Sequence, residues 1–147
     1  MATPDLRVLL TQMVPFINTV GLTIDDVGRG TATATLPARP EVNNHMGTAH
    51  AGAVYTLGES ASGGAVLSIF ADLLPDAFIA LKSSSVRHLK AAPGDVVATA
   101  AIVGEAKAIR AAYNETGKAD FDVDVTLSVG ELHTAQVVYT WAVRAPR

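Results

Sequence analysis

Polar and apolar positions alternate along the chain in two ways, and each way predicts a different kind of element. Apolar residues recur at helical spacing from Asp5 to about Phe16, and Pro15 and Gly21 are expected to end that helix. Between His50 and Asp72 the residues are almost all apolar or small, and this run of about twenty residues is too long for a strand. We therefore expect one short amphipathic helix near the N-terminus and one long buried helix after it.

The remaining segments have the pattern of β-strands. Residues 22–36 contain two runs rich in β-branched residues, separated by the turn-forming sequence Gly28-Arg29-Gly30, and they predict a hairpin. Four further strands are predicted in the second half of the chain: Ala77–Ala92, Asp95–Val103, Ala119–Val129 and His133–Arg144. The third of these alternates strictly between apolar and polar residues, which is typical of an antiparallel sheet with one wet face. Residues 105–117 are rich in helix formers and predict a short surface helix.

The predicted order of elements is a helix, two strands, one long helix and four strands. The fold class is therefore α+β, with one antiparallel sheet of about six strands covering one helix. Gly52, Gly58, Gly63 and Gly64 lie on that helix and would let the sheet approach its backbone. Each glycine costs about 1 kcal/mol of helix stability, so close packing or function is needed to explain four of them. No linker or repeat divides residues 1–147, and we expect a single domain.

Composition and charge narrow the classes of function. The chain has no cysteine, which excludes a disulfide framework, a thiolate zinc site and a cysteine nucleophile, and is compatible with the cytoplasm. Its net charge of −3 gives no case for a nucleic-acid or membrane-surface partner. We expect no signal peptide, because the N-terminus lacks a basic lead and a small-residue cleavage site. A membrane span is not expected either, since Glu59 interrupts the long apolar run.

Glu59 is the single charge in that run, and it has three interpretations. Burying a lone carboxylate costs several kcal/mol unless the group is paired or protonated. It could face solvent or pair with an arginine such as Arg87 or Arg110. It could instead make a structural contact at a subunit interface, or act as a catalytic base or nucleophile. Composition alone does not decide among these interpretations.

The residues at the start of the long helix favour chemistry. The sequence GTAHAG places the free backbone N–H groups of Ala51 and Gly52 beside His50, and such groups stabilise a developing oxyanion. His50 and Glu59 are nine residues apart, or about 13 Å along a helix, which is too far for a direct pair within one chain. A homodimer in which Glu59 comes from the other subunit is therefore the economical hypothesis.

One motif joins these residues: Asn44, then Gly47-Thr48-Ala49-His50-Ala51-Gly52, then Glu59 nine residues after the histidine. It resembles the signature of the hotdog-fold acyl-CoA thioesterases of the phenylacetate-degradation type, namely Asn, Gly-Thr-Leu-His-Gly-Gly, and Asp or Glu nine residues after His. The strand SSSVRHLKAAPGDVVATAAIV also resembles that family, and HAGAVYTLGESASG is most similar to its uncharacterised hotdog domains. The resemblance spans about residues 44–103 and implies a long helix wrapped by an antiparallel sheet, assembled as dimers and often tetramers.

The resemblance also implies roles for individual residues. Glu59 would be the catalytic carboxylate, either activating a water or attacking the thioester carbonyl itself. The N–H of Ala51 would polarise that carbonyl, while Asn44 and His50 would orient the water or the thioester. The substrate would be a small or medium acyl-CoA, so coenzyme A enters as part of the substrate. A positioned base and an oxyanion site can hydrolyse a thioester without a metal or another cofactor.

Substrate contacts are expected from small residues of the helix and from polar residues of the strand that follows it. These residues are Gly52, Ser60, Ser62, Gly63, Lys82, Ser83, Arg87 and Lys90. Arg87 and Lys90 would meet the nucleotide phosphates of coenzyme A, and a solvated strand end is an equally good interpretation of both. Three departures from the family pattern leave the acyl preference and the positioning of water open: Ala51 in place of a glycine, Gly63 in place of a hydroxyl, and Leu81 and Lys82 where some relatives have a serine.

Two other functions remain open at this point. His45 lies fourteen residues before Glu59, a separation that hotdog dehydratases use, but the His-Phe-Pro-Gly and Met-Pro-Gly surroundings of those enzymes are missing. A non-catalytic protein that binds acyl-CoA or lipid is the second alternative. A metal site at His45 and His50 lacks a clear third ligand and is not expected. His88 and His133 are expected to be ordinary strand residues, and Tyr139 and Trp141 are expected to pack within the sheet.

Overall fold

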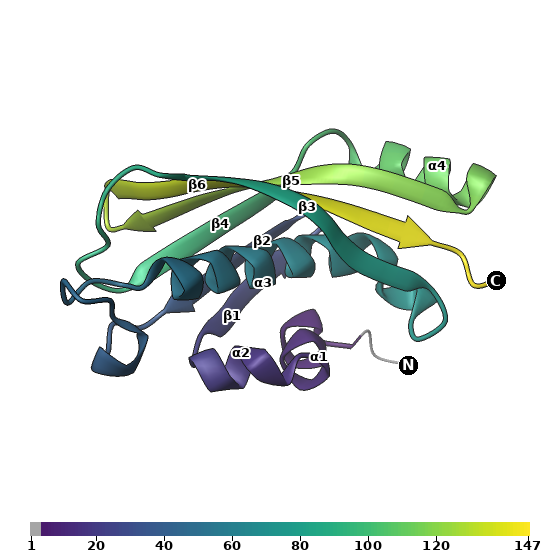
Figure 1. Ribbon diagram of the computed structural model, residues 1–147. Helices are drawn as coiled ribbons and strands as arrows, with labels where there is room; N and C mark the ends of the chain where they lie inside the picture. Colours follow the sequence, from purple (N-terminus) through teal and green to yellow (C-terminus); the bar gives the residue numbers. More distant parts are fainter. Residues whose placement is uncertain (1–3) are drawn as a thin grey trace.

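A computed structural model describes residues 4–147, and Figure 1 shows a sheet wrapped around one long helix. Residues 1–3 lie outside the described residues. They are the first part of the N-terminal segment for which no signal peptide is expected. The helices are α1 (Leu6–Met13), α2 (Pro15–Val20), α3 (Ala51–Phe70) and α4 (Ala106–Thr116), with 3-10 turns at Pro40–Val42 and Ala71–Leu73. The strands are β1 (Thr23–Gly28), β2 (Thr31–Leu36), β3 (Phe78–His88), β4 (Val96–Ile102), β5 (Lys118–Val129) and β6 (Leu132–Arg144).

The six strands form one antiparallel sheet in the order β1-β2-β4-β5-β6-β3. The predicted hairpin, β1 and β2, lies at one end of the sheet, and β3 lies at the other end, paired with β6. The alternation predicted for β5 is confirmed: Phe121, Val123, Val125 and Leu127 are buried, and the residues between them are at least partly exposed. The α+β architecture predicted from the sequence is therefore confirmed.

The long helix α3 is the centre of the core. From Leu57 to Phe70 every residue is buried except Glu59 and Ser68, which are partly exposed. The predicted buried helix is confirmed. None of the helices formed by residues 4–147 is long and apolar enough to cross a membrane.

The glycines of α3 do not share one role. A Cβ on Gly58 would collide with the hydroxyl of Tyr139, and a Cβ on Gly64 would lie 3.0 Å from Ala32 Cβ, so the sheet does approach the helix at these two positions. Gly63 leaves room, because its Cβ would be 3.8 Å from Trp141. The expectation that all four glycines let the sheet approach α3 was wrong for Gly52. A Cβ added there would face the ring of His50 rather than the sheet.

Two short helices, rather than the predicted single one, precede the sheet. Pro15 does not end a helix but begins α2, because proline lacks the N–H that the first helical residue does not need. Gly21 ends α2 in the left-handed conformation, with φ of 80°. Leu10 of α1 and Ile17 of α2 are buried in the core. Figure 1 shows both helices on the side of α3 that faces away from the sheet.

Candidate active site

Glu59 is half-buried on α3 and has no partner for its charge. Its carboxylate makes no hydrogen bond or ion pair with any of residues 4–147, and burial raises the pKa of that carboxyl above its usual range. Arg110 instead binds Asp72 through two hydrogen bonds of 2.7 and 2.8 Å. Arg87 is exposed on β3 and has no ion pair in the described chain. The interpretation of Glu59 as half of an arginine ion pair is therefore not supported within one chain.

The side chain of His50 caps α3. Its Nδ1 accepts a hydrogen bond of 2.8 Å from the backbone N–H of Gly52, so a neutral ring carries its proton on Nε2. The backbone N–H of Ala51, the first residue of the helix, donates to no group within residues 4–147. This N–H lies at the positive end of the helix dipole, where it can bind a negatively charged oxygen.

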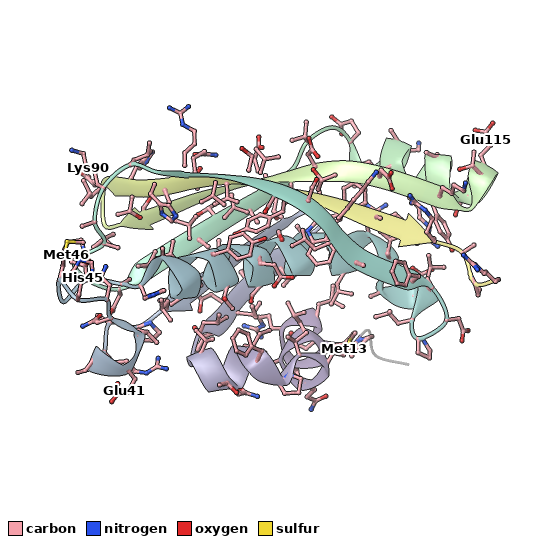
Figure 2. All side chains as sticks on the ribbon, viewed as in Figure 1. Met13, Glu41, His45, Met46, Lys90 and Glu115 are labelled. Carbon is pink, nitrogen blue, oxygen red and sulfur yellow. The ribbon has the colours of Figure 1, made fainter. Side chains whose placement is uncertain are left out.

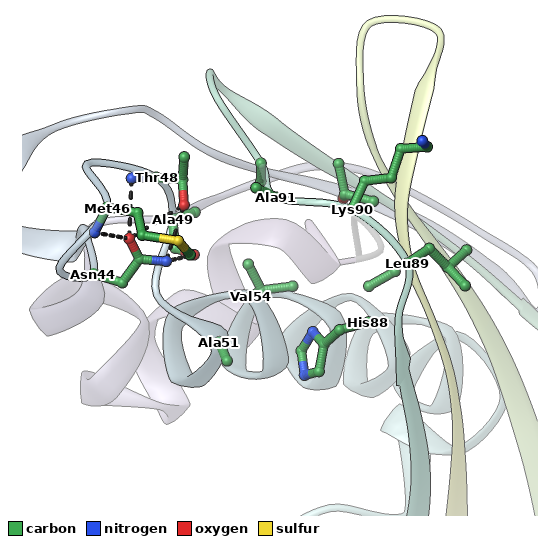
Figure 3. A pocket seen from close by; sticks show the side chains of 13 residues that line it. Asn44, Met46, Thr48, Ala49, Ala51, Val54, His88, Leu89, Lys90 and Ala91 are labelled. Atoms are coloured by element: carbon green, nitrogen blue, oxygen red, sulfur yellow. Dashed lines mark hydrogen bonds between the residues drawn. The ribbon is translucent and has the colours of Figure 1, made fainter.

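Asn44 closes the loop that leads into α3. Its Oδ1 accepts hydrogen bonds from the backbone N–H groups of Met46, at 2.9 Å, and Thr48, at 3.1 Å. Its Nδ2 donates to Thr48 Oγ1 at 2.9 Å, and Figure 3 shows these bonds around the side chain. Since both ends of the amide are used inside the loop, Asn44 positions the start of α3 in this chain.

Asn44 and Ala51 share one cavity of about 340 Å³, which we call the loop cavity. His88 and Lys90, from the end of β3 and the residues after it, also line this cavity, as Figure 3 shows. Figure 2 places Lys90 at the same end of the molecule as His45 and Met46 of the loop. Cationic and hydrogen-bonding groups therefore gather where α3 begins.

Glu59 lies in a different cavity, also of about 340 Å³, which we call the Glu59 cavity. It is bounded by α1, the second half of α3, the start of β3 and Trp141 of β6. His50 lines neither of these cavities but a third one of about 310 Å³, together with Arg39 and Thr56. One chain thus does not bring Glu59 into the same cavity as Asn44, His50 or Ala51.

Of the small residues predicted to contact substrate, the two glycines are near cavities or solvent, whereas the two serines are buried in the core. Gly63 lines the Glu59 cavity, and Gly52 is exposed at the start of α3. Ser60 and Ser62 are both buried, and their hydroxyls donate to the backbone carbonyls of Thr56 and Glu59, each at 2.7 Å. In this chain the two serines therefore serve the packing of α3, and their contact with substrate stays a prediction.

A bulge in β3 decides which of its side chains face α3. The pairing with β6 steps from Leu81↔Trp141 to Ser83↔Thr140, so Lys82 is an extra residue. Before the bulge, Leu81 lines the Glu59 cavity. After it, Ser84 contacts the hydroxyl of Tyr55 at 2.9 Å. The bulge therefore reverses the alternation of faces along the strand.

Three predicted substrate contacts lie on the face of the sheet away from α3, and the bulge is the reason for two of them, Ser83 and Arg87. Lys82 binds Asp120 on the outer face of the sheet at 2.9 Å, and Ser83 and Arg87 fall on that face by alternation from Ser84. Arg144 binds the same carboxylate at 2.6 Å, and together the two cations lower the pKa of Asp120 to about 2. Of the three basic residues predicted to contact substrate, Lys90 lines the loop cavity, and Lys82 and Arg87 do not.

Sequence reasoning missed two residues that line these cavities. His88 was expected to be an ordinary strand residue, but it lines the loop cavity because the bulge shifts its alternation. Trp141 was expected to serve only sheet packing, but its ring also forms a wall of the Glu59 cavity. The alternation of β6 could have placed Trp141 on the buried face, whereas the bulge left no signal for His88.

Three similar solved structures have the same fold over nearly the whole chain. PA5026 from Pseudomonas aeruginosa, a protein of unknown function described as a probable thioesterase, is 23% identical, with a TM-score of 0.83 over 99% of this chain and 98% of that chain. A variant of the thioesterase PA1618 from Pseudomonas aeruginosa is 19% identical, with a TM-score of 0.76 over 98% and 96%. A variant of the thioesterase SAV0944 from Staphylococcus aureus is 21% identical, with a TM-score of 0.68 over 89% and 99%. The hotdog fold expected from the sequence is confirmed.

Sequence comparison adds a family but no activity. A family model described as "Domain of unknown function (DUF4442)" matches residues 5–143. No curated protein matches the chain.

Proposed function

We propose that this chain, which belongs to the DUF4442 family, is a hotdog thioester hydrolase that cleaves acyl-CoA at a site shared by two subunits. The observation that carries the proposal is the carboxylate of Glu59, half-buried beside apolar side chains with no cation near it in residues 4–147. Burying a carboxylate without a partner lowers the stability of the fold, and such groups are found at sites where they act as a base or nucleophile. The names of the similar structures, which include thioesterases, support the same reaction class.

The free edge of β3 supports a two-subunit site. Within residues 4–147, β3 pairs only with β6, so its other edge is open for a second copy. At the His88 end this strand borders the loop cavity, and at the Leu81 end it borders the Glu59 cavity. Antiparallel pairing of two β3 strands about a two-fold axis would bring the loop cavity of one subunit beside the Glu59 cavity of the other.

The reaction follows from the groups that such a dimer brings together. Glu59 takes a proton from water, and the oxygen of that water attacks the thioester carbonyl carbon. The carbonyl oxygen becomes an oxyanion, which the N–H of Ala51 stabilises from the partner subunit. The tetrahedral intermediate then collapses to the carboxylic acid and expels the coenzyme A thiolate. The thiolate takes the proton from Glu59. Alternatively, Glu59 attacks the carbonyl carbon directly and expels the coenzyme A thiolate, and water then hydrolyses the resulting anhydride to release the carboxylic acid and free Glu59.

Release of free thiol from a panel of acyl-CoAs tests the activity. We expect turnover of at least one acyl-CoA, and a loss of about 10²-fold or more in Glu59→Gln, which keeps the size of the side chain but not its charge. A full rate in Glu59→Gln contradicts the role of Glu59. Saturable binding without turnover would instead identify an acyl-CoA-binding protein, and hydration of an enoyl thioester would identify a hydratase.

Mixing two inactive variants tests the shared site. If Asn44 and Glu59 act across the interface, a heterodimer of Asn44→Ala and Glu59→Gln chains has one intact site and one doubly altered site. Equal mixing with subunit exchange should then restore about one quarter of the wild-type activity. If both residues act within one chain, every site carries an alteration and no activity returns. Each variant mixed with itself is the control.

A further inference from the structure

We infer that the Glu59 cavity receives the acyl group, and that it selects uncharged hydrocarbon chains of medium length. This inference rests on the proposed function, because it assumes that the thioester carbonyl lies beside Glu59. Two residues would limit the length of the acyl chain: Gly63 in the middle of the cavity and Met13 at its α1 side.

Among residues 4–147, the side chains that line the cavity are apolar except for Glu59, the only ionisable one, and the indole N–H of Trp141. The other walls are aliphatic, aromatic or thioether groups, among them Leu10, Met13, Leu67, Leu74, Leu81 and Trp141. A carboxylate or hydroxyl at the far end of an acyl chain would find no hydrogen-bond partner there, and leaving a polar group unpaired in such a place is costly.

The one further polar group, the indole N–H of Trp141, is already used. It donates to the buried hydroxyl of Ser62 at 3.0 Å. The benzene part of the indole instead lies toward Gly63, where a Cβ would be 3.8 Å from its Cζ2 and Cη2 atoms. A ligand in the cavity therefore meets the apolar part of the tryptophan ring.

The cavity extends along α3 from Glu59 past Gly63 to Leu67. The eight residue steps from Glu59 to Leu67 span about 12 Å. The cavity volume of about 340 Å³ has room for roughly eleven groups the size of a water molecule, each about 30 Å³, which corresponds to an acyl chain of about ten carbons. An acetyl group would leave most of this space empty, and a palmitoyl group would exceed it.

A series of straight-chain acyl-CoAs tests the assignment. From butyryl- to octanoyl-CoA, kcat/KM should rise about fourfold for each added methylene, because each one leaves water for an apolar wall. The rise should stop near decanoyl-CoA and reverse by palmitoyl-CoA. Adipoyl-CoA, in which a carboxylate replaces the terminal methyl group of hexanoyl-CoA, should be at least about 10²-fold poorer than hexanoyl-CoA. A flat series, or adipoyl-CoA as good as hexanoyl-CoA, would overturn the inference.

Two substitutions should move the optimum in opposite directions. Gly63→Val adds methyl groups inside the cavity, so decanoyl-CoA should lose at least about tenfold in kcat/KM while butyryl-CoA changes less than about twofold. Met13→Ala opens the α1 side and should favour longer chains over octanoyl-CoA by about tenfold. Ala112→Leu, which adds similar bulk at an exposed position of α4, is the matched control and should leave the series unchanged. An unchanged optimum in both cavity variants contradicts the inference.

Binding of non-hydrolysable S-alkyl-CoA thioethers separates this inference from the proposed activity. Calorimetry should show affinity that rises with alkyl length and falls in Gly63→Val, even in the Glu59→Gln background. If this pattern holds without any thioester hydrolysis, the cavity assignment stands and the proposed function fails. If hydrolysis occurs but neither affinity nor rate depends on chain length, the proposed function stands and the cavity assignment fails. Absence of both binding and hydrolysis overturns both.

Discussion

The hydroxyl of Tyr139 occupies the space beside Gly58 that the Cβ of any other residue would fill. The same hydroxyl donates a hydrogen bond of 2.8 Å to the backbone carbonyl of Tyr55, one turn earlier on α3. Burial raises the pKa of Tyr139, so the hydroxyl stays protonated and remains a donor. Tyr139 therefore holds β6 against α3 at the residue before Glu59. This contact fixes the part of α3 that carries the carboxylate relative to the sheet.

The substitution Gly58→Ala should destabilise the protein despite the better helix propensity of alanine. Alanine gains about 1 kcal/mol in a helix, but the new Cβ must displace Tyr139 and its hydrogen bond, at about 1–3 kcal/mol or more. Tyr139→Phe removes the clashing oxygen and should recover part of the loss. Urea unfolding of the two single variants and the double variant measures this coupling.

Gly63→Ala is the matched control on the same helix. Its Cβ would find only ordinary contacts, at 3.8 Å from Trp141 and 4.0 Å from Leu10, so it should raise the free energy of unfolding by up to about 1 kcal/mol. Equal effects at Gly58 and Gly63 would show that the approach of Tyr139 does not constrain the helix.

Glu59→Gln should make the protein more stable while it removes activity. The pKa of Glu59 is raised in the folded chain, so burial disfavours the ionised form. At pH below the unfolded value of about 4.3, both states hold the proton and burial costs nothing extra. As pH rises through that value towards the folded pKa, the wild-type protein loses stability that the glutamine variant keeps. The difference in melting temperature should therefore grow from about pH 4 towards neutrality and then level off.

The pH dependence of hydrolysis checks the same group by rate. Because the base must be ionised, the acid limb of the kcat/KM profile should fall above the ordinary pKa of glutamate. An acid limb below about pH 4, or a Glu59→Gln variant that melts lower than wild type at neutral pH, would contradict the burial of this carboxylate.

Ser62→Ala should lower the free energy of unfolding by about 1–3 kcal/mol, because it leaves the buried indole N–H of Trp141 without an acceptor. Ser60→Ala is the matched control: Ser60 is equally buried, but its hydroxyl only donates to Thr56, and no donor in residues 4–147 depends on it. Trp141 is the only tryptophan of the chain, so its fluorescence reports the local change. Equal losses in the two variants would argue against a special role of the Trp141 bond.

Asp120 should contribute to acid unfolding. Its folded pKa of about 2 lies below the unfolded value of about 3.9, because Arg144 and then Lys82 stabilise the carboxylate. A depressed pKa stabilises the folded state above the unfolded value, and this stability is lost as pH falls from about 4 to 2. Since the group is partly exposed, we expect about 1 kcal/mol or less. Asp120→Asn should show a smaller loss over this range, whereas Asp124→Asn, which breaks no ion pair within residues 4–147, should behave like wild type.

The architecture could be predicted because it depends on periodicity within single segments. The alternation of β5 and the apolar run of α3 each indicate an element without reference to the rest of the chain. The N-terminal break was missed because Pro15 both disfavours a helix interior and suits a first helical turn, and packing of Leu10 and Ile17 on α3 decided between these.

The candidate site was less predictable, because its geometry depends on groups far apart in sequence. Glu59 and Ala51 could be selected as residue types in a motif, and their spacing on one helix already predicted that they lie apart, but the residues that wall the two cavities depend on the course of β3. The faces of Ser83 and Arg87 depend on one extra residue in that strand, which no propensity reveals.

The bulge at Lys82 also means that odd-numbered residues face α3 before it and even-numbered residues face α3 after it. A regular strand that kept Lys82 would turn each later side chain to the other face, so Arg87 would point at α3 and His88 would leave the loop cavity for solvent. Deleting Lys82 would instead let Ser83 follow Leu81 in an unbroken alternation, and Arg87 and His88 would keep their present faces. The bulge is thus a place where β3 can lose one residue without any change in which side chains line the loop cavity.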